Sequence, residues 1–432
     1  MVPCSSMGTT TSRTCLMRPP RLASKVAPGS TSTLVIPTSP GLQGTRALPR
    51  RRWPSVAAPW SRSCQHGTVD MTLLDRVISR GRVSGLDAVG VASAEPFMTT
   101  RRDLESRKGA GLHGGMQFTY RNSARSTDAS ATLAGARSIV VGALGYGGPE
   151  PIRPPGPQGR IARYARADLY GDLRKALGEV ARLLQDEGWS TRTVADDNAL
   201  VDREAAYRAA LGWYGKNSNL LLPGRGSWFV LGSVITDAPL RLAERRVPDG
   251  CHTCRRCMEG CPTGAIVEPG VVDSRRCLAW LVQRTGSFPR EYRRALGDRI
   301  YGCDECQEVC PLNRPDIRDS GTVAVSGHDG DVGAWVSPLE MLKADDETLM
   351  QRHGRWYIPG RDPRYLRRNA LIVLGNTACG NDGEVEAVLI EYLSSEDDLL
   401  VEHAAGAASE LGRLDLVEEM ATGPVAKDHV EP

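Results

Sequence analysis

The stretch Cys251-His-Thr-Cys254-Arg-Arg-Cys257-Met-Glu-Gly-Cys261-Pro262 decides the organisation of this chain. A second cysteine run, Cys303-Asp-Glu-Cys306-Gln-Glu-Val-Cys310-Pro311, follows further along the sequence. Eight of the twelve cysteines therefore lie between residues 251 and 310 of a 432-residue chain. Thiols clustered so tightly in a long chain indicate metal ligation in a reducing compartment rather than a disulfide framework.

The spacing of the first run is that of bacterial ferredoxins, in which the fourth cysteine ligates the other of two iron–sulfur clusters. The second run has three cysteines where four are needed, and Cys277 is the nearby thiol that completes the count. Soft thiolates suit iron–sulfur clusters, although a zinc ribbon with extra cysteines is an alternative. The sequence thus predicts two [4Fe-4S] clusters, one held by Cys251, Cys254, Cys257 and Cys310, the other by Cys261, Cys277, Cys303 and Cys306. We expect Cys4, Cys15, Cys64 and Cys379 to take no part.

Residues 71–245 alternate short β-branched runs with helical patterns, which predicts a layered domain of mixed α/β class. The expected strands are Ala88–Ala92, Ser138–Leu144, Arg192–Ala195 and Trp228–Thr236; the expected helices begin near Leu73 and cover Asp172–Glu187 and Asp202–Leu211. The cysteine-rich segment 246–315 predicts a ferredoxin-like domain, and residues 316–361 an irregular linker. Leu-Gly pairs at 374–375 and 411–412 predict a HEAT-like helical repeat over residues 362–420.

Residues 1–70 differ in composition from the rest of the chain. They hold nine Lys and Arg and one acidic residue, whereas the remainder holds 45 bases and 50 acids. The body is thus mildly acidic, so nucleic-acid binding would need a local basic patch. Arg50-Arg51-Arg52-Trp53 is not followed by the apolar segment of an export signal, and we interpret residues 1–70 as a disordered extension or a mis-called start. No run of 18 apolar residues occurs, which excludes an integral membrane protein.

A second group of polar residues precedes the cysteines. Asp196 and Asp197 follow an expected strand, and Gly212-Trp-Tyr-Gly-Lys-Asn217 follows an expected helix. This arrangement is typical of a ligand-holding loop. By itself the pattern is weak, because an aspartate in such a place is more often an N-cap or turn residue than a proton donor.

Together with the cysteines, these motifs resemble epoxyqueuosine reductase. The resemblance runs from about Met71 to about residue 415 and includes His113-Gly-Gly-Met116, Ile161-Ala-Arg-Tyr-Ala165 and Tyr301-Gly-Cys-Asp304. It implies a cytoplasmic, monomeric oxidoreductase that is related to reductive dehalogenases. Such an enzyme uses cob(II)alamin and two [4Fe-4S] clusters to reduce epoxyqueuosine at the wobble position of tRNA to queuosine.

The resemblance also implies individual roles. Asp196 takes the place of the family's general acid, and cobalamin contacts fall on Arg125, Asp196, Lys216, Asn217, Ser218, Leu278 and Ala279. The sequence departs from the family pattern at two places: Tyr170-Gly171 stands where many members have Asp-Tyr-His, and Leu312 replaces a common Trp.

The expected partners are the anticodon stem-loop of a queuosine-family tRNA and a low-potential electron donor such as ferredoxin or flavodoxin. The tRNA surface is expected to use scattered cations, namely Arg284, Arg290, Arg293, Arg294, Arg367 and Arg368, each of which could equally be an ordinary surface charge. Two alternatives remain at this point: a cobalamin-dependent enzyme of the reductive dehalogenase type, and a two-cluster electron-transfer protein without catalysis.

Overall fold

The computed structural model of the chain describes residues 72–243, 245–313 and 333–422. The predicted extension, residues 1–70, lies outside the described residues. The first helix, α1 (Leu73–Val83), begins where the sequence predicted. Thr72 is its N-cap: the Thr72 hydroxyl accepts a hydrogen bond from the Asp75 backbone N–H at 3.2 Å, and the Asp75 carboxylate accepts one from the Thr72 N–H at 3.3 Å. This reciprocal capping box fixes the start of the helix.

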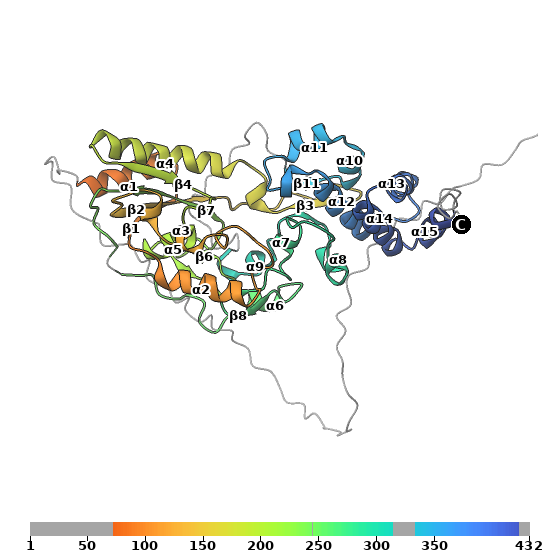
Figure 1. Cartoon of the computed structure of the whole chain (residues 1–432), viewed down its shortest axis with the longest axis horizontal. Helices are drawn as coiled ribbons and strands as arrows, with labels where there is room; N and C mark the ends of the chain where they lie inside the picture. Colours follow the sequence, from red (N-terminus) through yellow and green to blue (C-terminus); the bar gives the residue numbers. More distant parts are fainter. Residues whose placement is uncertain (1–71, 244, 314–332, 423–432) are drawn as a thin grey trace, which may run out of the picture. The chain divides into compact units, whose positions relative to one another are not determined.

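A four-stranded sheet lies at the centre of the first domain (Figure 1). Its strands, in spatial order, are β1 (Ala88–Ser93), β2 (Ser138–Gly145), β7 (Phe229–Thr236) and β4 (Thr191–Val194). The four predicted strands are confirmed within one or two residues. All three pairings are antiparallel, so the domain is of the α+β kind. Alternation of helices and strands along the sequence does not fix strand direction, because that depends on where each connection crosses the sheet.

Both faces of this sheet are covered. Along β2, Val140 belongs to the apolar cluster under α1 and α4 (Leu169–Asp186), while Ile139 and Val141 belong to the cluster under α5 (Asp202–Arg208). Side chains of a strand alternate between faces, so a continuous apolar strand is buried on both sides. Figure 1 shows α4 lying along one face of the sheet.

A second, small sheet joins parts of the chain that the sequence analysis treated as separate domains. Its central strand, β3 (Gly159–Ile161), pairs in parallel with β10 (Arg299–Tyr301) and antiparallel with β11 (Trp335–Val336). The layered domain, the cysteine-rich segment and the segment that follows it therefore share one set of backbone hydrogen bonds.

The remaining elements before residue 313 are short, apart from α2, and surround the cysteines. They are the helices α2 (Met98–Gly109), α3 (Ser123–Ser126), α6 (Arg256–Glu259), α7 (Leu278–Leu281), α8 (Arg290–Leu296) and α9 (Glu305–Glu308), with the hairpins β5 (Trp213–Tyr214)–β6 (Leu220–Leu221) and β8 (Ile266–Glu268)–β9 (Val271–Val272). Single 3-10 turns are η1 (Ala129–Ala131), η2 (Arg163–Ala165) and η3 (Pro311–Asn313).

The prediction of an irregular linker over residues 316–361 is wrong for its described part. Residues 333–361 contain β11, α10 (Pro338–Lys343), α11 (Asp346–His353) and the turn η5 (Pro359–Arg361). Trp356 stacks on Tyr301 with ring centroids 4.4 Å apart and donates a hydrogen bond to the Ala165 carbonyl at 2.9 Å. These helices are too short to show a clear 3.6-residue period in the sequence. The segment is ordered by its contacts with β10 and η2 rather than by a local sequence pattern.

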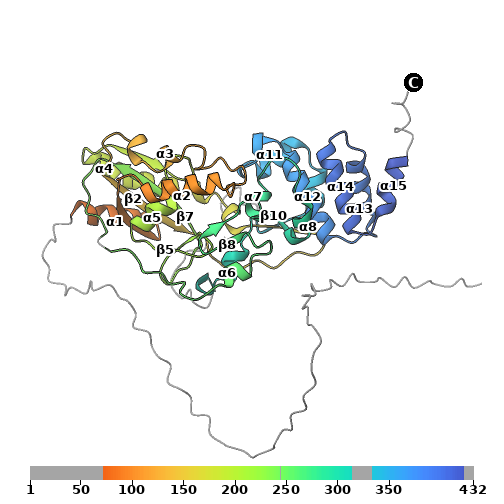
Figure 2. The same ribbon diagram turned by 60° about the horizontal axis from the view of Figure 1, so that its bottom comes forward.

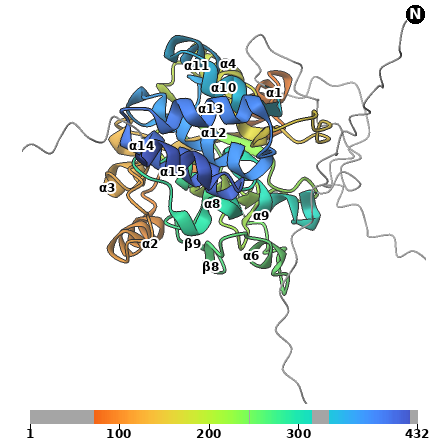
Figure 3. The same ribbon diagram turned by 90° about the vertical axis from the view of Figure 1, so that its right-hand side faces the viewer.

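Four helices complete the described chain: α12 (Arg364–Thr377), α13 (Gly383–Leu393), α14 (Asp398–Glu410) and α15 (Leu414–Thr422). In Figure 3 these four helices face the viewer. The first Leu-Gly pair lies inside the last turn of α12, whereas in the second pair Leu411 is the C-cap of α14 and Gly412 follows it. Helices α12 and α14 pack against each other. A Cβ on Gly375 would lie 2.8 Å from the Ala407 Cα, so the two helix backbones approach closely at this point. Two helix pairs agree with the predicted helical tail; its assignment to the HEAT class stays a prediction.

The structure corrects one predicted role in this tail. Arg368 was expected on a tRNA-binding surface, yet it is completely buried. Its guanidinium donates hydrogen bonds to the carbonyls of Arg284 and Gly286 at 2.8 and 2.6 Å, and to that of Val282 at 3.1 Å. Burial lowers the pKa of Arg368 to about 10, so the group stays charged at neutral pH. Arg368 is therefore an anchor between α12 and the segment that follows α7.

Neighbouring polar residues act in the same way. The buried Asn369 donates to the carbonyls of Val282 and Ile300 at 2.9 and 3.3 Å, and the buried His403 accepts a hydrogen bond from the Phe288 N–H at 3.2 Å. Figure 2 shows α7, α8, β10 and α12 gathered in one region. These buried polar residues thus attach the tail to the cysteine-rich segment. Within the described residues, no helix has both the length and the apolar character needed to cross a membrane.

The close contact between α12 and α14 makes a testable prediction. Gly375→Ala should destabilise the protein by about 1–3 kcal/mol, because the new methyl group overlaps the backbone of α14. Gly178→Ala in α4 is the matched control, since its Cβ would meet no atom within 4 Å and alanine favours a helix by about 0.5–1 kcal/mol. Denaturant unfolding of both variants measures the difference, and equal stability would contradict the close packing.

Candidate functional site

A large cavity of about 1130 Å³ opens between the layered domain and the cysteine-rich segment. Ordinary ligand pockets measure about 300–1,000 Å³, so this cavity suits an unusually large ligand. Its wall comes from several elements, including α2, α5, β7, the β5–β6 hairpin and α7. Neutral hydrogen-bonding side chains are frequent in the wall, namely Thr99, Thr100, Asn217, Ser218, Gln283 and Gln307.

Four of the eight clustered cysteines border this cavity, and we call them the inner thiols: Cys261, Cys277, Cys303 and Cys306. They lie close enough to affect one another. Burial holds the pKa of the Cys306 thiol well above its usual value, and negative charge on Cys303, Cys277 or Cys261 would raise it further. The predicted inner cluster takes ligands from both cysteine runs and Cys277, so its four thiols must lie close together, as they do here.

The other four cysteines, the outer thiols, are Cys251, Cys254, Cys257 and Cys310, and they are absent from the cavity wall. They also lie together: burial raises the pKa of Cys257, and the nearby thiols of Cys251, Cys310 and Cys254 raise it further. Such thiols are largely protonated without a metal, and cluster binding deprotonates them. Among the described residues, no His, Cys, Asp or Glu group is arranged to hold a single metal ion.

The β5–β6 hairpin connects both thiol sets. It is tight because Gly212 packs against the Leu221 backbone, where a Cβ would overlap the carbonyl oxygen. From its turn, the Lys216 ammonium donates a hydrogen bond to the His252 carbonyl at 2.7 Å, and the Asn217 side-chain amide donates to the Cys306 carbonyl at 3.2 Å. The motif Gly212–Asn217 therefore supports the backbone of both cysteine runs.

Asp196 lies at the cavity wall in a loop between β4 and α5, with a left-handed φ of 53°. Its side chain is exposed to the cavity, and the protein packed around that cavity raises the pKa of its carboxyl by burial. The Arg174 guanidinium lowers this pKa, and the Asp197 carboxylate raises it. The net effect is an upward shift, which favours the protonated acid.

The alternative interpretation of Asp196 as a helix cap is wrong. The N-cap of α5 is Val201, with no side-chain capping bond. It is Asp197 whose carboxylate accepts a hydrogen bond from the Ala199 N–H at 2.6 Å and so forms the turn. Among the described residues, the Asp196 carboxylate has no hydrogen-bond or ion-pair partner, and it is left to act on a ligand.

Most of the predicted cofactor contacts meet at this cavity. Asp196, Asn217, Ser218, Leu278 and Ala279 all belong to its wall. Arg125, exposed on α3, and Lys216, engaged with the His252 carbonyl, are not part of it. As contacts of cobalamin, these two residues stay predictions without support from the cavity.

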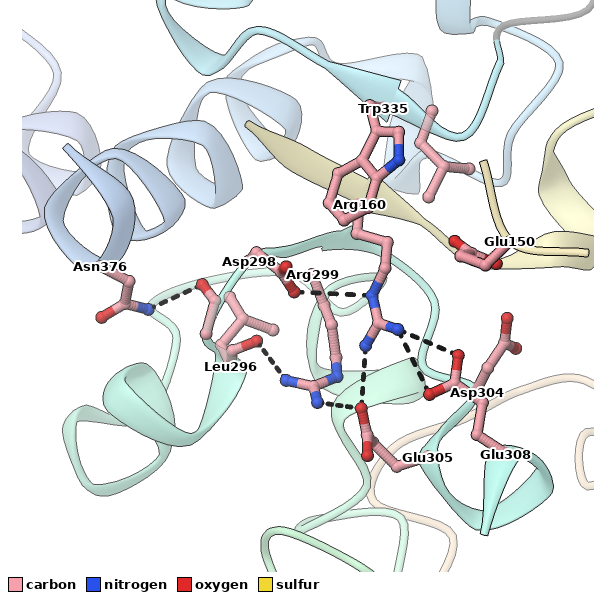
Figure 4. Close-up of polar contacts among 12 residues, drawn as sticks. Glu150, Arg160, Leu296, Asp298, Arg299, Asp304, Glu305, Glu308, Trp335 and Asn376 are labelled. Atoms are coloured by element: carbon pink, nitrogen blue, oxygen red, sulfur yellow. Dashed lines mark hydrogen bonds and ion pairs between the residues drawn. The ribbon is translucent and has the colours of Figure 1, made fainter. Parts of the chain in front are cut away.

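A partly buried ion-pair network supports the helix of the second cysteine run, and the sequence analysis missed it (Figure 4). Arg160 on β3 pairs with Glu305 at 2.8 Å and Glu308 at 2.9 Å, which lie on either side of Cys306 on α9, and with Asp298 at 3.5 Å. Arg299 pairs with Glu305 as well. Although burial acts to raise the pKa of Glu305, the Arg299 and Arg160 guanidinium groups hold it below its usual value.

Two further residues at the wall were given no role in the sequence analysis. Tyr170, at the start of α4, and Asp202, at the start of α5, both lie near Asp196. Burial holds the pKa of Asp202 well above its usual range, and the negative charge of Asp196 raises it further. Only the folding of α4 and α5 onto the same end of the sheet brings these groups together.

Comparison with known proteins adds the decisive relationship. Residues 250–313 match the family model described as a 4Fe-4S double cluster binding domain, which confirms the predicted domain for two clusters. Epoxyqueuosine reductase of Bacillus anthracis is 32% identical over 314 residues, covering 69% of this chain and 79% of the relative. The chain belongs to the epoxyqueuosine reductase family. The Xanthomonas campestris member is 29% identical over 355 residues and is covered over 96% of its length.

Solved structures agree with membership of the epoxyqueuosine reductase family. The Bacillus subtilis enzyme, with its catalytic loop swung out of the active site, superposes with a TM-score of 0.72 at 26% identity, covering 82% of this chain and 95% of that one. A second structure contains an epoxyqueuosine-modified stem loop of tyrosine tRNA; it has a TM-score of 0.71 at 25% identity and covers 83% and 94%. The family fold therefore extends over both the cavity and the helical tail.

The Arg160 network makes a second prediction. Arg160→Met should lower the free energy of unfolding by about 1–3 kcal/mol and reduce iron content, because Glu308 loses its partner and Glu305 keeps only Arg299. The Arg182→Met control removes a solvent-exposed pair with Glu179 on α4 and should cost about 0.5 kcal/mol or less. Denaturant unfolding and iron analysis measure both effects.

The pH dependence of the same variant has a defined sign. Glu305 has a lowered pKa in the folded state, so its stabilisation is present above the ordinary glutamate pKa of about 4.3 and is lost as the pH falls through the folded value. Arg160→Met should flatten this acid limb of the stability curve. An unchanged acid limb would show that the network does not stabilise the cysteine run.

Proposed function

We propose that this chain reduces epoxyqueuosine in tRNA to queuosine, using cobalamin and two [4Fe-4S] clusters. The observation that carries the proposal is that Asp196 and the four inner thiols border one large cavity, in a chain of the epoxyqueuosine reductase family. An acid and an electron source thus meet where a large cofactor and a nucleoside have room to bind.

The cavity fits cobalamin in size and in chemistry. A corrin ring is wide, largely apolar and fringed with amide groups, and the wall combines apolar residues such as Leu278 and Ala279 with neutral donors and acceptors such as Asn217 and Gln283. Asn217, Ser218, Leu278 and Ala279 would therefore hold the cofactor. When bound, cobalamin supplies reduced cobalt for cleavage of a carbon–oxygen bond, and the protein contributes orientation, protons and electron delivery.

The reaction needs two electrons and two protons. Both carbon–oxygen bonds of the epoxide break, a carbon–carbon double bond forms, and the oxygen leaves as water. The inner thiols border the cavity and the outer thiols do not, so we assign the inner cluster to deliver electrons to the cavity and the outer cluster to supply the inner one.

We assign Asp196 as the general acid. An epoxide oxygen leaves more readily once it is protonated, and a carboxyl with a raised pKa keeps its proton to a higher pH than an ordinary aspartate does. Filling the cavity removes water from around Asp196 and so raises its pKa further. Turnover should therefore fall as the pH rises above the pKa of this group.

We propose that the tRNA anticodon loop presents its base at the same cavity. A relative's structure with a modified stem loop supports this, as does the presence of Arg107, Arg203 and Arg246 in the cavity wall. Single-stranded loops are recognised by bases turned out of the stack together with phosphate contacts. Of the arginines predicted from sequence, Arg290 and Arg294 are exposed, whereas Arg293 is paired with Glu402 and Arg367 lies 2.5 Å from Asp346.

Family membership disfavours the two alternative functions, a reductive dehalogenase-type enzyme and an electron carrier without catalysis. We further propose that the enzyme works in the cytoplasm, where its tRNA substrate is found, and that it takes electrons from a ferredoxin or flavodoxin. The expected monomeric state stays a prediction.

Asp196→Asn tests the assigned acid. The amide keeps the size of the side chain but cannot donate the proton in the same way, so turnover should fall by about 10²–10⁴ while cobalamin and iron content remain. The control is Asp197→Asn, whose amide oxygen can still accept the Ala199 N–H and hold the turn. Single-turnover assays on epoxyqueuosine-containing tRNA measure both. Near-normal turnover in a fully loaded Asp196→Asn enzyme would refute the assignment.

Cys277→Ala tests the ligand assignment. Anaerobically reconstituted wild-type protein should bind about eight iron atoms, as two four-iron clusters require. The variant should fall toward about four, because Cys277 is the one ligand of the inner cluster outside both cysteine runs. Cys379→Ala, a substitution in the loop after α12 and outside both cysteine runs, should keep the full content. Unchanged iron in Cys277→Ala would show that another group completes the inner cluster.

A further inference from the structure

One of the outer thiols is exposed to solvent, whereas the four inner thiols are only partly exposed. Cys254 is exposed, and so are the residues beside it, His252, Thr253, Arg255 and Arg256. None of these five residues belongs to the cavity wall. A partner protein in solution can therefore reach the loop of residues 251–257 without entering the cavity.

This exposed loop has a defined shape. His252 adopts a left-handed φ of 41°, and its carbonyl accepts a hydrogen bond from the Lys216 ammonium at 2.7 Å. The Cys251 N–H donates to the Asp249 carboxylate at 2.8 Å, and the Cys254 N–H donates to the Cys251 carbonyl at 2.9 Å. The loop is thus fixed at both ends while its outward face stays open to a partner.

The charge on this face is unbalanced. Among the described residues, Arg255 and Arg256 have no ion-pair partner, and Lys216 adds a third cation that is held by a carbonyl rather than by a carboxylate. Asp249 and Glu259 are the acidic residues that adjoin the loop in sequence. Several acids elsewhere in the cysteine-rich segment are paired: Asp273 pairs with Arg275 at 2.8 Å, and Glu305 and Glu308 pair with Arg160.

We propose that the loop of residues 251–257, with Arg255 and Arg256, is the docking surface for a small acidic electron-carrier protein. This inference rests on the proposed function and deepens it by placing the entry point of the electrons. Complementary charge steers a partner to such a surface and raises the association rate by about 10–10³-fold at low salt. The mildly acidic body of the enzyme would repel an acidic carrier elsewhere, so two unpaired arginines beside an exposed cluster ligand define where it docks.

The step at this surface is a one-electron transfer. The reduced carrier gives one electron to the oxidised outer cluster, the electron passes to the inner cluster, and the carrier leaves oxidised. Two such encounters provide the two electrons that the deoxygenation consumes. A tRNA phosphate is the other polyanion that the arginines could attract, but these residues lie apart from the cavity wall, where the nucleoside must bind.

The experiment measures cluster reduction directly and needs no tRNA substrate, so its failure is distinct from failure of the proposed function. Reconstituted Arg255→Glu/Arg256→Glu enzyme is mixed anaerobically with reduced flavodoxin, and cluster bleaching is followed by stopped flow. The second-order rate constant should fall at least about tenfold at low salt, and the difference from wild type should shrink as salt screens the charges. Reduced methyl viologen, a small cation, should reduce the variant at least as fast as the wild type.

Two further variants make the result decisive. Arg255→Gln/Arg256→Gln removes the positive charges without introducing repulsion. Its rate of reduction by flavodoxin should lie between those of the wild type and Arg255→Glu/Arg256→Glu. It replaces the Glu variant in the test if that variant loses iron. Arg290→Glu/Arg294→Glu reverses two exposed arginines on α8 and should leave the flavodoxin rate unchanged. Wild-type flavodoxin rates in an iron-replete 255/256 variant would overturn the proposal. So would weakened binding of tRNA in that variant with an unchanged flavodoxin rate.

Discussion

The charge cluster around Arg160 is the constraint on which the arrangement of the site depends. One guanidinium on a three-residue strand neutralises carboxylates on both sides of Cys306 and also reaches Asp298 before β10. Partly buried carboxylates that lost this partner would destabilise the fold. The strand that carries Arg160 also pairs with β10 and β11, so the same contact sets the cysteine-rich segment against the layered domain. The cavity exists because these two parts are held at that junction.

Buried polar anchors extend the constraint to the helical tail. Arg368 and Asn369 on α12 bond to backbone carbonyls around the end of α7, the helix that begins directly after Cys277. A charged group without surface exposure is tolerated because carbonyl oxygens and an amide occupy its donors. The tail therefore has a structural effect on the inner cluster, independent of any contact that its exposed residues make with tRNA.

The site separates its tasks in space. Inner thiols and Asp196 border one cavity, so the proposed electron supply and proton supply would meet at a single bound substrate. The exposed Cys254 and two unpaired arginines lie on the solvent side, where a carrier can dock without entering the cavity. The hairpin of Lys216 and Asn217 bonds to the backbone of both cysteine runs, so the two ends of the electron path are held at a fixed distance.

The sequence by itself determined the local chemistry. Ligand spacing between thiols acts over a few residues, so the cysteine runs were visible, as were strands buried on both faces such as β2. What depends on distant residues was not visible: the sheet that β3 shares with β10 and β11, the burial of Arg368, and the Arg160 network. An arginine looks the same in a sequence whether it faces solvent, tRNA or a buried carboxylate. Only the tertiary structure decides which of these it meets, because its energy depends on the partners and water around it.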